Sequence, residues 1–189
     1  VASKGVVGLG SSITSGHRGL MRIAIIGSGS VGSGLARGWS CLGHAVVIGS
    51  RTPDSERLGD LVVEIGNGVE AAGLSNSVIG ADVVVLAVPW KAAKDSVMAL
   101  GDLSGQTVID ATNPFVKGLN MGLGQDESGG EFVAGWAIGA NVVKALNIVD
   151  ARLLDGKKLD GREISIPICG DDEESKQIVI RLIAELGFD

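Results

Sequence analysis

The chain lacks tyrosine altogether and has only two histidines and two cysteines among its 189 residues. A tyrosine acid or base is therefore excluded, and with it the tyrosine–lysine pair of short-chain dehydrogenases. The two cysteines form no C-x-x-C motif, and apart from His44, three residues after Cys41, no histidine lies near either in the sequence, so the usual spaced ligand sets for zinc are also missing. We expect Cys41 and Cys169 to be reduced, buried core thiols.

Long apolar runs and an excess of positive charge are absent as well. The longest uninterrupted apolar stretch, 83–88, is far shorter than the roughly 20 residues that a transmembrane helix needs. The net charge of −6 leaves no broad basic surface, so we expect neither nucleic acid nor a membrane as a partner. An anionic ligand would need a local cationic pocket. The composition, 45% hydrophobic and 20% charged, is typical of one globular cytoplasmic domain.

The first twenty residues differ in composition from the rest of the chain. They are rich in glycine and serine and contain no acidic residue, so they cannot form a core element. We predict that 1–20 is a disordered leader left by an expression vector or by upstream translation. A processed organelle transit segment is the alternative, because Lys4, Arg18 and the serines fit that composition. Met21 begins a strand-like stretch, which places a single domain at 21–189.

Strand-like and helix-like segments alternate along that domain. Strands are expected at 22–26, 45–48, 69–72, 82–88, 107–111, 141–146 and 164–169, and helices at 31–42, 52–65, 90–100 and 172–186. This alternation predicts an α/β fold with a doubly wound, mostly parallel sheet, because right-handed crossovers place helices on both faces. Ligands bind such Rossmann folds at the carboxyl ends of the strands. The residues that directly follow each strand are therefore the candidates for function.

A glycine-rich turn follows the first predicted strand. It has the pattern G-x-G-x-x-G and consists of Gly27, Ser28, Gly29, Ser30, Val31 and Gly32. In this position Gly27 permits a tight turn, Gly29 lets the backbone approach a pyrophosphate, and Gly32 allows close helix packing. The N-terminus of the following helix would attract the phosphates. The turn therefore predicts a dinucleotide site.

The second predicted strand ends in Gly49, Ser50 and Arg51. Domains that bind NAD usually carry an Asp or Glu here, which hydrogen-bonds the ribose hydroxyls. A carboxylate would repel a 2′-phosphate, whereas the Ser50 hydroxyl and the Arg51 guanidinium can bind one. We therefore predict NADP(H) as the cofactor.

No residue is well placed as a general acid or base. His17 lies in the leader, and His44 lies in the turn that enters the second strand, on the side of the sheet opposite the ligand crevice. The chemistry that remains is a hydride transfer in which the protein holds two rings face to face and the cofactors supply the reactivity.

Several segments that follow strands together resemble the deazaflavin-dependent (coenzyme F420-dependent) NADP reductases. They are the turn at 27–34, Gly49-Ser50-Arg51, and the segments 86–90 (LAVPW), 142–147 (VVKALN) and 166–172 (IPICGDD). The likeness covers nearly all of 21–189. It implies a cytoplasmic oxidoreductase, often a homodimer, that passes hydride between NADP(H) and a deazaflavin without a protein acid or base.

The resemblance also implies roles for individual residues. The pyrophosphate would be held by Ser28, Gly29, Ser30 and Val31, the 2′-phosphate by Ser50 and Arg51, and the nicotinamide half by Val88, Pro89 and Ala145. The second ring would be bordered by Trp90, Asn113, Pro114 and Asn147. For Trp90, plain packing at a helix start is the alternative.

Two departures leave the second cofactor open between coenzyme F420 and a flavin. The segment 110–114 (DATNP) resembles the related branch that includes the cytosolic domains of membrane ferric reductases, where the acceptor is a flavin. Lys91-Ala92 stands where deazaflavin reductases have Glu-His. Family members also continue past the position of Asp189, so we expect part of the acceptor site or dimer interface to lie in such a segment.

Two other functions compete with this interpretation. An imine or hydroxyacid reductase of the β-hydroxyacid type would share the N-terminal half but needs a large helical C-terminal domain. A non-enzymatic, dinucleotide-sensing regulatory module belongs to a different class. Such modules more often carry an acidic residue after the second strand, and Ser50-Arg51 argues against one.

Overall fold

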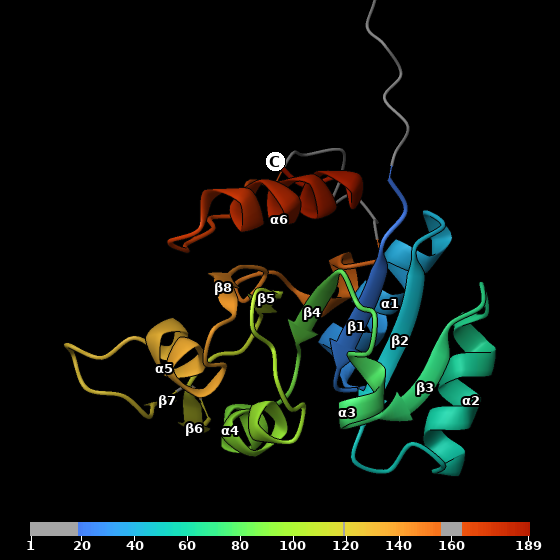
Figure 1. The fold of residues 1–189 in the computed structure, drawn as a ribbon, viewed down its shortest axis with the longest axis horizontal. Helices are drawn as coiled ribbons and strands as arrows, with labels where there is room; N and C mark the ends of the chain where they lie inside the picture. The colour runs from blue at the N-terminus through green and yellow to red at the C-terminus, as the bar shows by residue number, and fades with distance from the viewer. Residues whose placement is uncertain (1–18, 119, 156–163) are drawn as a thin grey trace, which may run out of the picture.

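The computed structural model describes residues 19–118, 120–155 and 164–189 and shows the predicted α/β architecture (Figure 1). Almost all of the predicted leader, 1–18, lies outside the described residues. Six strands form the main sheet in the order β3-β2-β1-β4-β5-β8, and all five pairings are parallel. Their bounds are β1 Arg22–Ile26, β2 Ala45–Ser50, β3 Glu70–Gly73, β4 Val83–Leu86, β5 Thr107–Asp110 and β8 Asn141–Lys144. This is the strand order of a Rossmann fold.

Helices cover both faces of the sheet, which confirms the doubly wound prediction. They are α1 Ser30–Cys41, α2 Glu56–Ile65, α3 Leu74–Ser77, α4 Trp90–Met98, α5 Gly129–Trp136 and α6 Glu173–Glu185, with a short 3-10 helix at Ala151–Leu153. Alternate residues along each strand point to opposite faces of the sheet and contribute to two separate hydrophobic cores. Ile23, Ile25 and their neighbours pack against α1, α2 and α6, while Ala24 and Ile26 pack toward α4 and α5. No helix in the described ranges is long and apolar enough to cross a membrane.

The second helix begins later than the sequence predicts. Thr52 and Pro53 do not start a helix; they form a turn in which the Ser55 backbone N–H donates to the Thr52 carbonyl at 3.2 Å. Pro at the second position of such a turn is as favourable as Pro in the first helical turn, so the motif fits both. Ser55 is the N-cap, and α2 begins at Glu56.

The predicted strand at 164–169 is also wrong. Only Cys169 makes a bridge to the sheet, antiparallel to Lys144. Ile164 and Ile166 exchange backbone hydrogen bonds with Asp189 at the end of the chain instead. Pro167 has no N–H to donate, which prevents a continuous ladder across this segment.

Several elements were not predicted: the short helix α3, the 3-10 helix at Ala151–Leu153, and the elements of the insertion between β5 and β8. The residues between β5 and β8 form a small antiparallel hairpin, β6 Phe115–Lys117 and β7 Asn120–Met121, followed by α5. Its sequence carries little apolar periodicity, because the hairpin leaves the large side chains of Phe115, Val116 and Met121 exposed. The long insertion brings α5 against α4 and β8, where it borders a cavity described below.

Helix α6 has a conventional N-cap that α1 lacks. The Asp172 side chain accepts from the Ser175 backbone N–H at 2.7 Å. That hydrogen bond lowers the pKa of Asp172 below its ordinary value, because it favours the charged carboxylate. The cap is therefore present at neutral pH and is lost when the pH falls through that lowered pKa.

Candidate dinucleotide site and a second cavity

The glycine-rich turn follows β1 directly and is packed tightly at two of its three glycines. Gly27 has φ +115°, and a Cβ there would lie 2.5 Å from the Ala87 carbonyl oxygen. A Cβ on Gly32 would lie 2.0 Å from the Gly27 carbonyl oxygen. A Cβ on Gly29 would meet nothing within 4 Å. Packing within the protein therefore explains why residues 27 and 32 are glycines, whereas the space beside Gly29 is open for a ligand.

The N-terminus of α1 adjoins that open space. Its N-cap is Gly29, which has no side chain to cap the helix, and its first turn contains no acidic residue. By contrast, the first turns of α2, α5 and α6 each contain a glutamate. The free N–H groups of the first turn and the helix dipole make this end of α1 an anion site.

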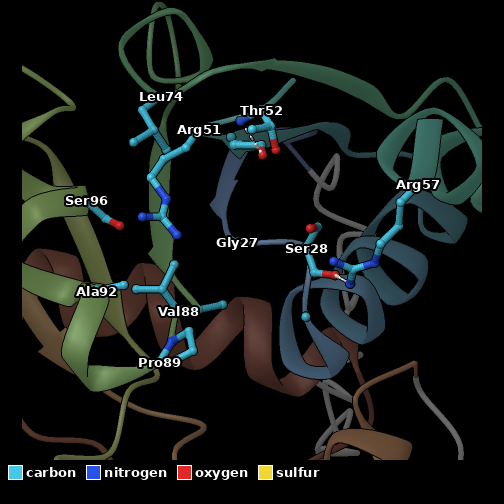
Figure 2. Close-up of a pocket in the computed structure, with 14 residues that line it drawn as sticks. Gly27, Ser28, Arg51, Thr52, Arg57, Leu74, Val88, Pro89, Ala92 and Ser96 are labelled. Carbon is cyan, nitrogen blue, oxygen red and sulfur yellow. Dashed lines mark hydrogen bonds between the residues drawn. The ribbon is translucent and has the colours of Figure 1, made fainter. Parts of the chain in front are cut away.

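A cavity of about 530 Å³ opens beside the turn (Figure 2). We call it the phosphate cavity. It is lined by Gly27, Ser28, Gly29, Gly49, Ser50, Arg51, Thr52, Arg57, Leu74, Ala87, Val88, Pro89, Ala92 and Ser96. Two arginines line it and no carboxylate does, although the chain carries a net charge of −6. The phosphate cavity is the local cationic pocket that an anionic ligand requires.

The structure brings most of the predicted cofactor residues to this cavity. Ser28, Gly29, Ser50 and Arg51 line it together with Val88 and Pro89, which come from the loop between β4 and α4. The Ser50 hydroxyl accepts from the Thr52 backbone N–H at 3.1 Å, which orients the end of β2. Figure 2 shows the exposed Arg51 side chain pointing across the cavity toward Val88 and Ser96.

Four predicted residues lie outside the lining of the phosphate cavity, one of them Gly32, which packs against the Gly27 carbonyl. Ser30 lines a neighbouring groove with Ser28 and Gly29. Val31 packs against the core, and Ala145 is fully buried in that same core. Ala145 therefore contacts only the protein interior, and neither its side chain nor its backbone is exposed to either cavity.

Arg57 lines the phosphate cavity and was not predicted. It lies in the first turn of α2, and its Nη2 donates to the Ser28 carbonyl oxygen at 3.2 Å. The sequence predicts a helix that starts at Thr52, which places Arg57 inside the helix. Arg57 was therefore not recognised as a residue near the helix start, where it could face the ligand crevice. Correct placement of the turn at Thr52–Ser55 would have brought it to the crevice.

A second cavity, of about 440 Å³, lies between α5 and the ends of β5 and β8. We call it the acceptor cavity. Three of the four residues predicted to border the second ring line it: Asn113, Pro114 and Asn147. Asn113 Nδ2 donates to the Asn147 carbonyl at 2.7 Å, and Asn147 Nδ2 donates back to Asn113 Oδ1 at 3.1 Å. The two asparagines thus fix one another across segments that are far apart in the sequence.

A partly buried ion pair supports the wall of the acceptor cavity. Asp110 is completely buried at the end of β5, and its Oδ2 accepts from Lys144 Nζ at 2.9 Å. Its Oδ1 accepts from the Thr112 hydroxyl at 2.7 Å and from the Thr112 backbone N–H at 2.9 Å. Lys144 also donates to the Thr112 carbonyl. This network holds the loop that carries Asn113, and Lys144 itself lines the cavity.

Trp90 lies in an aromatic cluster rather than in the lining of either cavity. Its ring centroid is 5.2 Å from that of Trp136 and 6.4 Å from that of Phe132, both on α5. Its indole still approaches the acceptor cavity, since a Cβ on the lining residue Gly129 would lie 3.7 Å from Trp90 Cη2. Packing is thus the observed role of Trp90, at the border of the predicted ring site.

His44 lies where the sequence predicts, at the amino end of β2 and away from both cavities. It is almost completely buried, and its Nε2 lies 2.7 Å from Glu185 Oε2. Its Nδ1 accepts from the Met21 backbone N–H at 3.1 Å. His44 therefore ties β2 to α6 and to the start of the domain.

The cysteines correct the sequence prediction. Both Cys41 and Cys169 are free and exposed rather than buried. Cys41 is the last residue of α1, and Cys169 lies at the sheet edge beside β8. A residue at a helix end or at the edge of a sheet has one side open to solvent, which the apolar sequence around each cysteine does not reveal. No group of three or more His, Cys, Asp or Glu side chains in the described ranges could hold a metal ion.

Comparison with protein-family models finds one match. The family described as "NADP oxidoreductase coenzyme F420-dependent" matches residues 22–114, which include every residue that lines the phosphate cavity. The acceptor cavity extends beyond the matched range.

Two curated reductases are also similar to this chain in sequence. The metalloreductase STEAP3 of Rattus norvegicus is 30% identical over 168 residues, which cover 88% of this chain and 32% of that protein. The F420-dependent NADP reductase of Methanothermobacter thermautotrophicus is 36% identical over 102 residues, 50% of this chain and 44% of that protein. This chain therefore spans less than half the length of either curated relative.

This chain spans most of the length of a protein whose structure is solved. A protein from Arthrobacter sp. FB24, provisionally assigned as an F420-dependent NADP reductase, superimposes with a TM-score of 0.81 at 30% identity. The match covers 89% of this chain and 82% of that one.

Proposed function

Since this chain belongs to the family of coenzyme F420-dependent NADP oxidoreductases, we propose that it binds NADP(H) in the phosphate cavity and exchanges hydride with a deazaflavin ring in the acceptor cavity. The cofactors would supply the chemistry: a hydride leaves the reduced nicotinamide for the acceptor ring, and the acceptor takes any further proton from water. The protein's own contribution is to bind and align the two rings.

The observation that carries this proposal is the phosphate cavity. Its residues match what NADP(H) needs: an open backbone at Gly29, an uncapped helix N-terminus for the diphosphate, and Ser50 and Arg51 for a 2′-phosphate. An acidic residue at the end of β2 would favour NAD(H), and none lines this cavity.

A transfer without a protein acid or base is supported by what is missing or engaged at the usual acid and base residue types, although Glu127, Glu131 and Asp171 do line the acceptor cavity. Tyrosine is absent from the chain, and His44 is buried at the opposite end of the sheet with both ring nitrogens hydrogen-bonded. Lys144 is engaged by Asp110 and Thr112. We assign Asn113, Pro114 and Asn147 to the wall of the second ring, with Trp90 behind it. We assign Val88 and Pro89 to the nicotinamide side, while Ala145 is buried in the core.

A flavin or ferric reductase of the same fold is the second candidate. The similarity to STEAP3 extends over 88% of this chain, farther than the 50% matched to the methanogen reductase. The segment 110–114 also resembles that branch, and Lys91-Ala92 departs from the Glu-His of deazaflavin reductases. The proposed nicotinamide site is the same in both cases, and only the acceptor differs.

The experiment is to mix the purified protein with NADPH and, in separate reactions, with oxidised coenzyme F420, FMN or a ferric chelate, and to follow nicotinamide absorbance. We expect the protein to oxidise NADPH when coenzyme F420 is the acceptor, and to oxidise NADPH faster than it oxidises NADH. Turnover with FMN or ferric chelate alone would select the second candidate. Tight NADPH binding without turnover on any acceptor would instead favour a dinucleotide-sensing module.

We further propose that the protein acts on small molecules in the cytoplasm as a homodimer, without nucleic acid or membrane as a partner. Light scattering on the purified protein tests the dimer, because a monomeric mass at micromolar concentration would contradict it.

A further inference from the structure

Arg57 is the cation of the phosphate cavity that no sequence motif assigns. It belongs to α2 rather than to the end of β2, yet its guanidinium reaches the glycine-rich turn, where Nη2 lies 3.2 Å from the Ser28 carbonyl oxygen. Figure 2 shows Arg57 beside Ser28 on one side of the cavity and Arg51 on the other. The two guanidiniums therefore approach the cavity from opposite sides.

The guanidinium of Arg57 keeps most of its hydrogen-bonding capacity. It carries five N–H donors, and the one hydrogen bond recorded for it within the described part of the chain is that to Ser28. The bond fixes the head group at the mouth of the cavity. The remaining donors are available to a second acceptor, and a phosphate is the acceptor that a guanidinium fork matches best.

Charge decides on which side of Arg57 a phosphate would bind. The neighbouring groove, which Arg57 also lines, contains Glu56, Asp60 and Glu64, whose carboxylates repel an anion. The phosphate cavity contains Arg51 and no carboxylate. A phosphate next to Arg57 is therefore favoured on the Arg51 side, close to the Ser28 and Ser50 hydroxyls.

Two kinds of phosphate occur in NADP(H), and the site already has a place for one. The diphosphate belongs at the N-terminus of α1, where backbone N–H groups are free. Building on the proposed NADP(H) function, we infer that Arg57 binds the 2′-phosphate opposite Arg51, so that two arginines from different elements clamp it and Arg57 determines cofactor specificity jointly with Arg51.

The test is calorimetric binding of four ligands to the intact protein: NADPH, NADH, 2′,5′-ADP and ADP-ribose. The third carries a 2′-phosphate without the diphosphate bridge, and the fourth carries the bridge without a 2′-phosphate. We expect Arg57→Ala to weaken NADPH and 2′,5′-ADP by about tenfold or more, while NADH and ADP-ribose change by less than about threefold.

Two variants control the interpretation. Arg57→Gln keeps an N–H donor for the Ser28 carbonyl but removes the charge, so it should lose as much NADPH affinity as Arg57→Ala. Arg37→Ala removes a positive charge from α1 that is paired with Glu64 and lies outside the phosphate cavity, so it should leave all four affinities unchanged.

The outcomes separate this inference from the proposed function. Equal losses for ADP-ribose and 2′,5′-ADP would overturn the inference, because Arg57 would then serve the diphosphate or the turn itself. An unchanged NADPH affinity in Arg57→Ala would overturn it as well. Failure of the unmodified protein to bind NADPH would instead overturn the proposed function.

Discussion

The phosphate cavity and the acceptor cavity are built in different ways. Every residue that lines the first lies between Gly27 and Ser96, within the range matched by the family model. The second is assembled from the ends of β5 and β8, the insertion that contains α5, and the segment 169–171. The first is therefore mainly a property of consecutive β-α units, whereas the second depends on how distant segments pack.

The two cavities also differ in whether their polar groups are free to bind a ligand or are already hydrogen-bonded within the protein. The phosphate cavity offers free backbone N–H groups and two arginines without carboxylate neighbours in its lining. In the acceptor cavity, Asn113 is paired with Asn147 and Lys144 with Asp110. The first is prepared to bind charge, while the second presents a wall already fixed by its own hydrogen bonds, which suits the alignment of a ring.

The largest effect should come from closing the space beside Gly29. Gly29→Val places a branched side chain where the diphosphate would lie, and we expect NADPH affinity to fall by more than about a thousandfold, roughly 4 kcal/mol. The fold should persist, because an added Cβ meets nothing within 4 Å. Calorimetry measures the affinity. Gly59→Val in α2, where a Cβ is equally free, is the matched control, and normal NADPH binding by Gly29→Val would show that the turn is only structural.

Breaking the ion pair between Lys144 and the buried Asp110 should damage the acceptor cavity more than the phosphate cavity. Lys144→Met leaves the Asp110 carboxylate buried without its partner, which should cost about 3 kcal/mol of unfolding free energy. Urea denaturation measures that loss. Under conditions where the variant remains folded, NADPH affinity should be nearly unchanged while turnover falls.

A double variant sharpens this prediction. Asp110→Leu with Lys144→Met removes both charges and should recover part of the stability, since replacing a buried pair by apolar residues is often tolerated. Equal loss of NADPH affinity and turnover in Lys144→Met would contradict the independence of the two cavities.

Removing the cation at the end of β2 should have a smaller effect. Arg51→Ala deletes one charge-assisted contact to the 2′-phosphate, so NADPH affinity should fall by about tenfold, or 1.4 kcal/mol, with NADH affinity unchanged. Titration of both nucleotides measures the preference. If the unmodified protein bound NADPH and NADH equally, Ser50 and Arg51 would not be the discriminator.

The smallest effect is expected at His44, which lies far from both cavities. His44→Gln should leave turnover within about twofold once folding is verified, because no acid or base step depends on it. NADPH deuterated at the transferred position should give a primary isotope effect in the same assay, without a bell-shaped pH profile. A steep loss of activity in the folded variant would show that the transfer does use a protein acid or base.

Much of the fold followed from short-range patterns in the sequence. The glycine-rich turn, the β-branched run at β4 and the helix periodicity of α1 and α6 each depend on neighbours a few residues away. The errors arose where one pattern fits two structures. Thr52-Pro53 suits a helix start or a turn, and the apolar segment 164–169 resembles a strand until Pro167 and the chain end at Asp189 decide its pairing.

The sequence by itself determined the glycine-rich turn and the cationic end of β2, because their residues are consecutive and their conformations are set by glycine and by strand ends. Tertiary structure alone decided the rest of the site. It exposed Cys41 and Cys169, brought Arg57 to Ser28, and joined Asp110 to Lys144 and Asn113 to Asn147. The last two pairs form only when the sheet aligns the carboxyl ends of β5 and β8, which are far apart in the sequence, so no local periodicity predicts them.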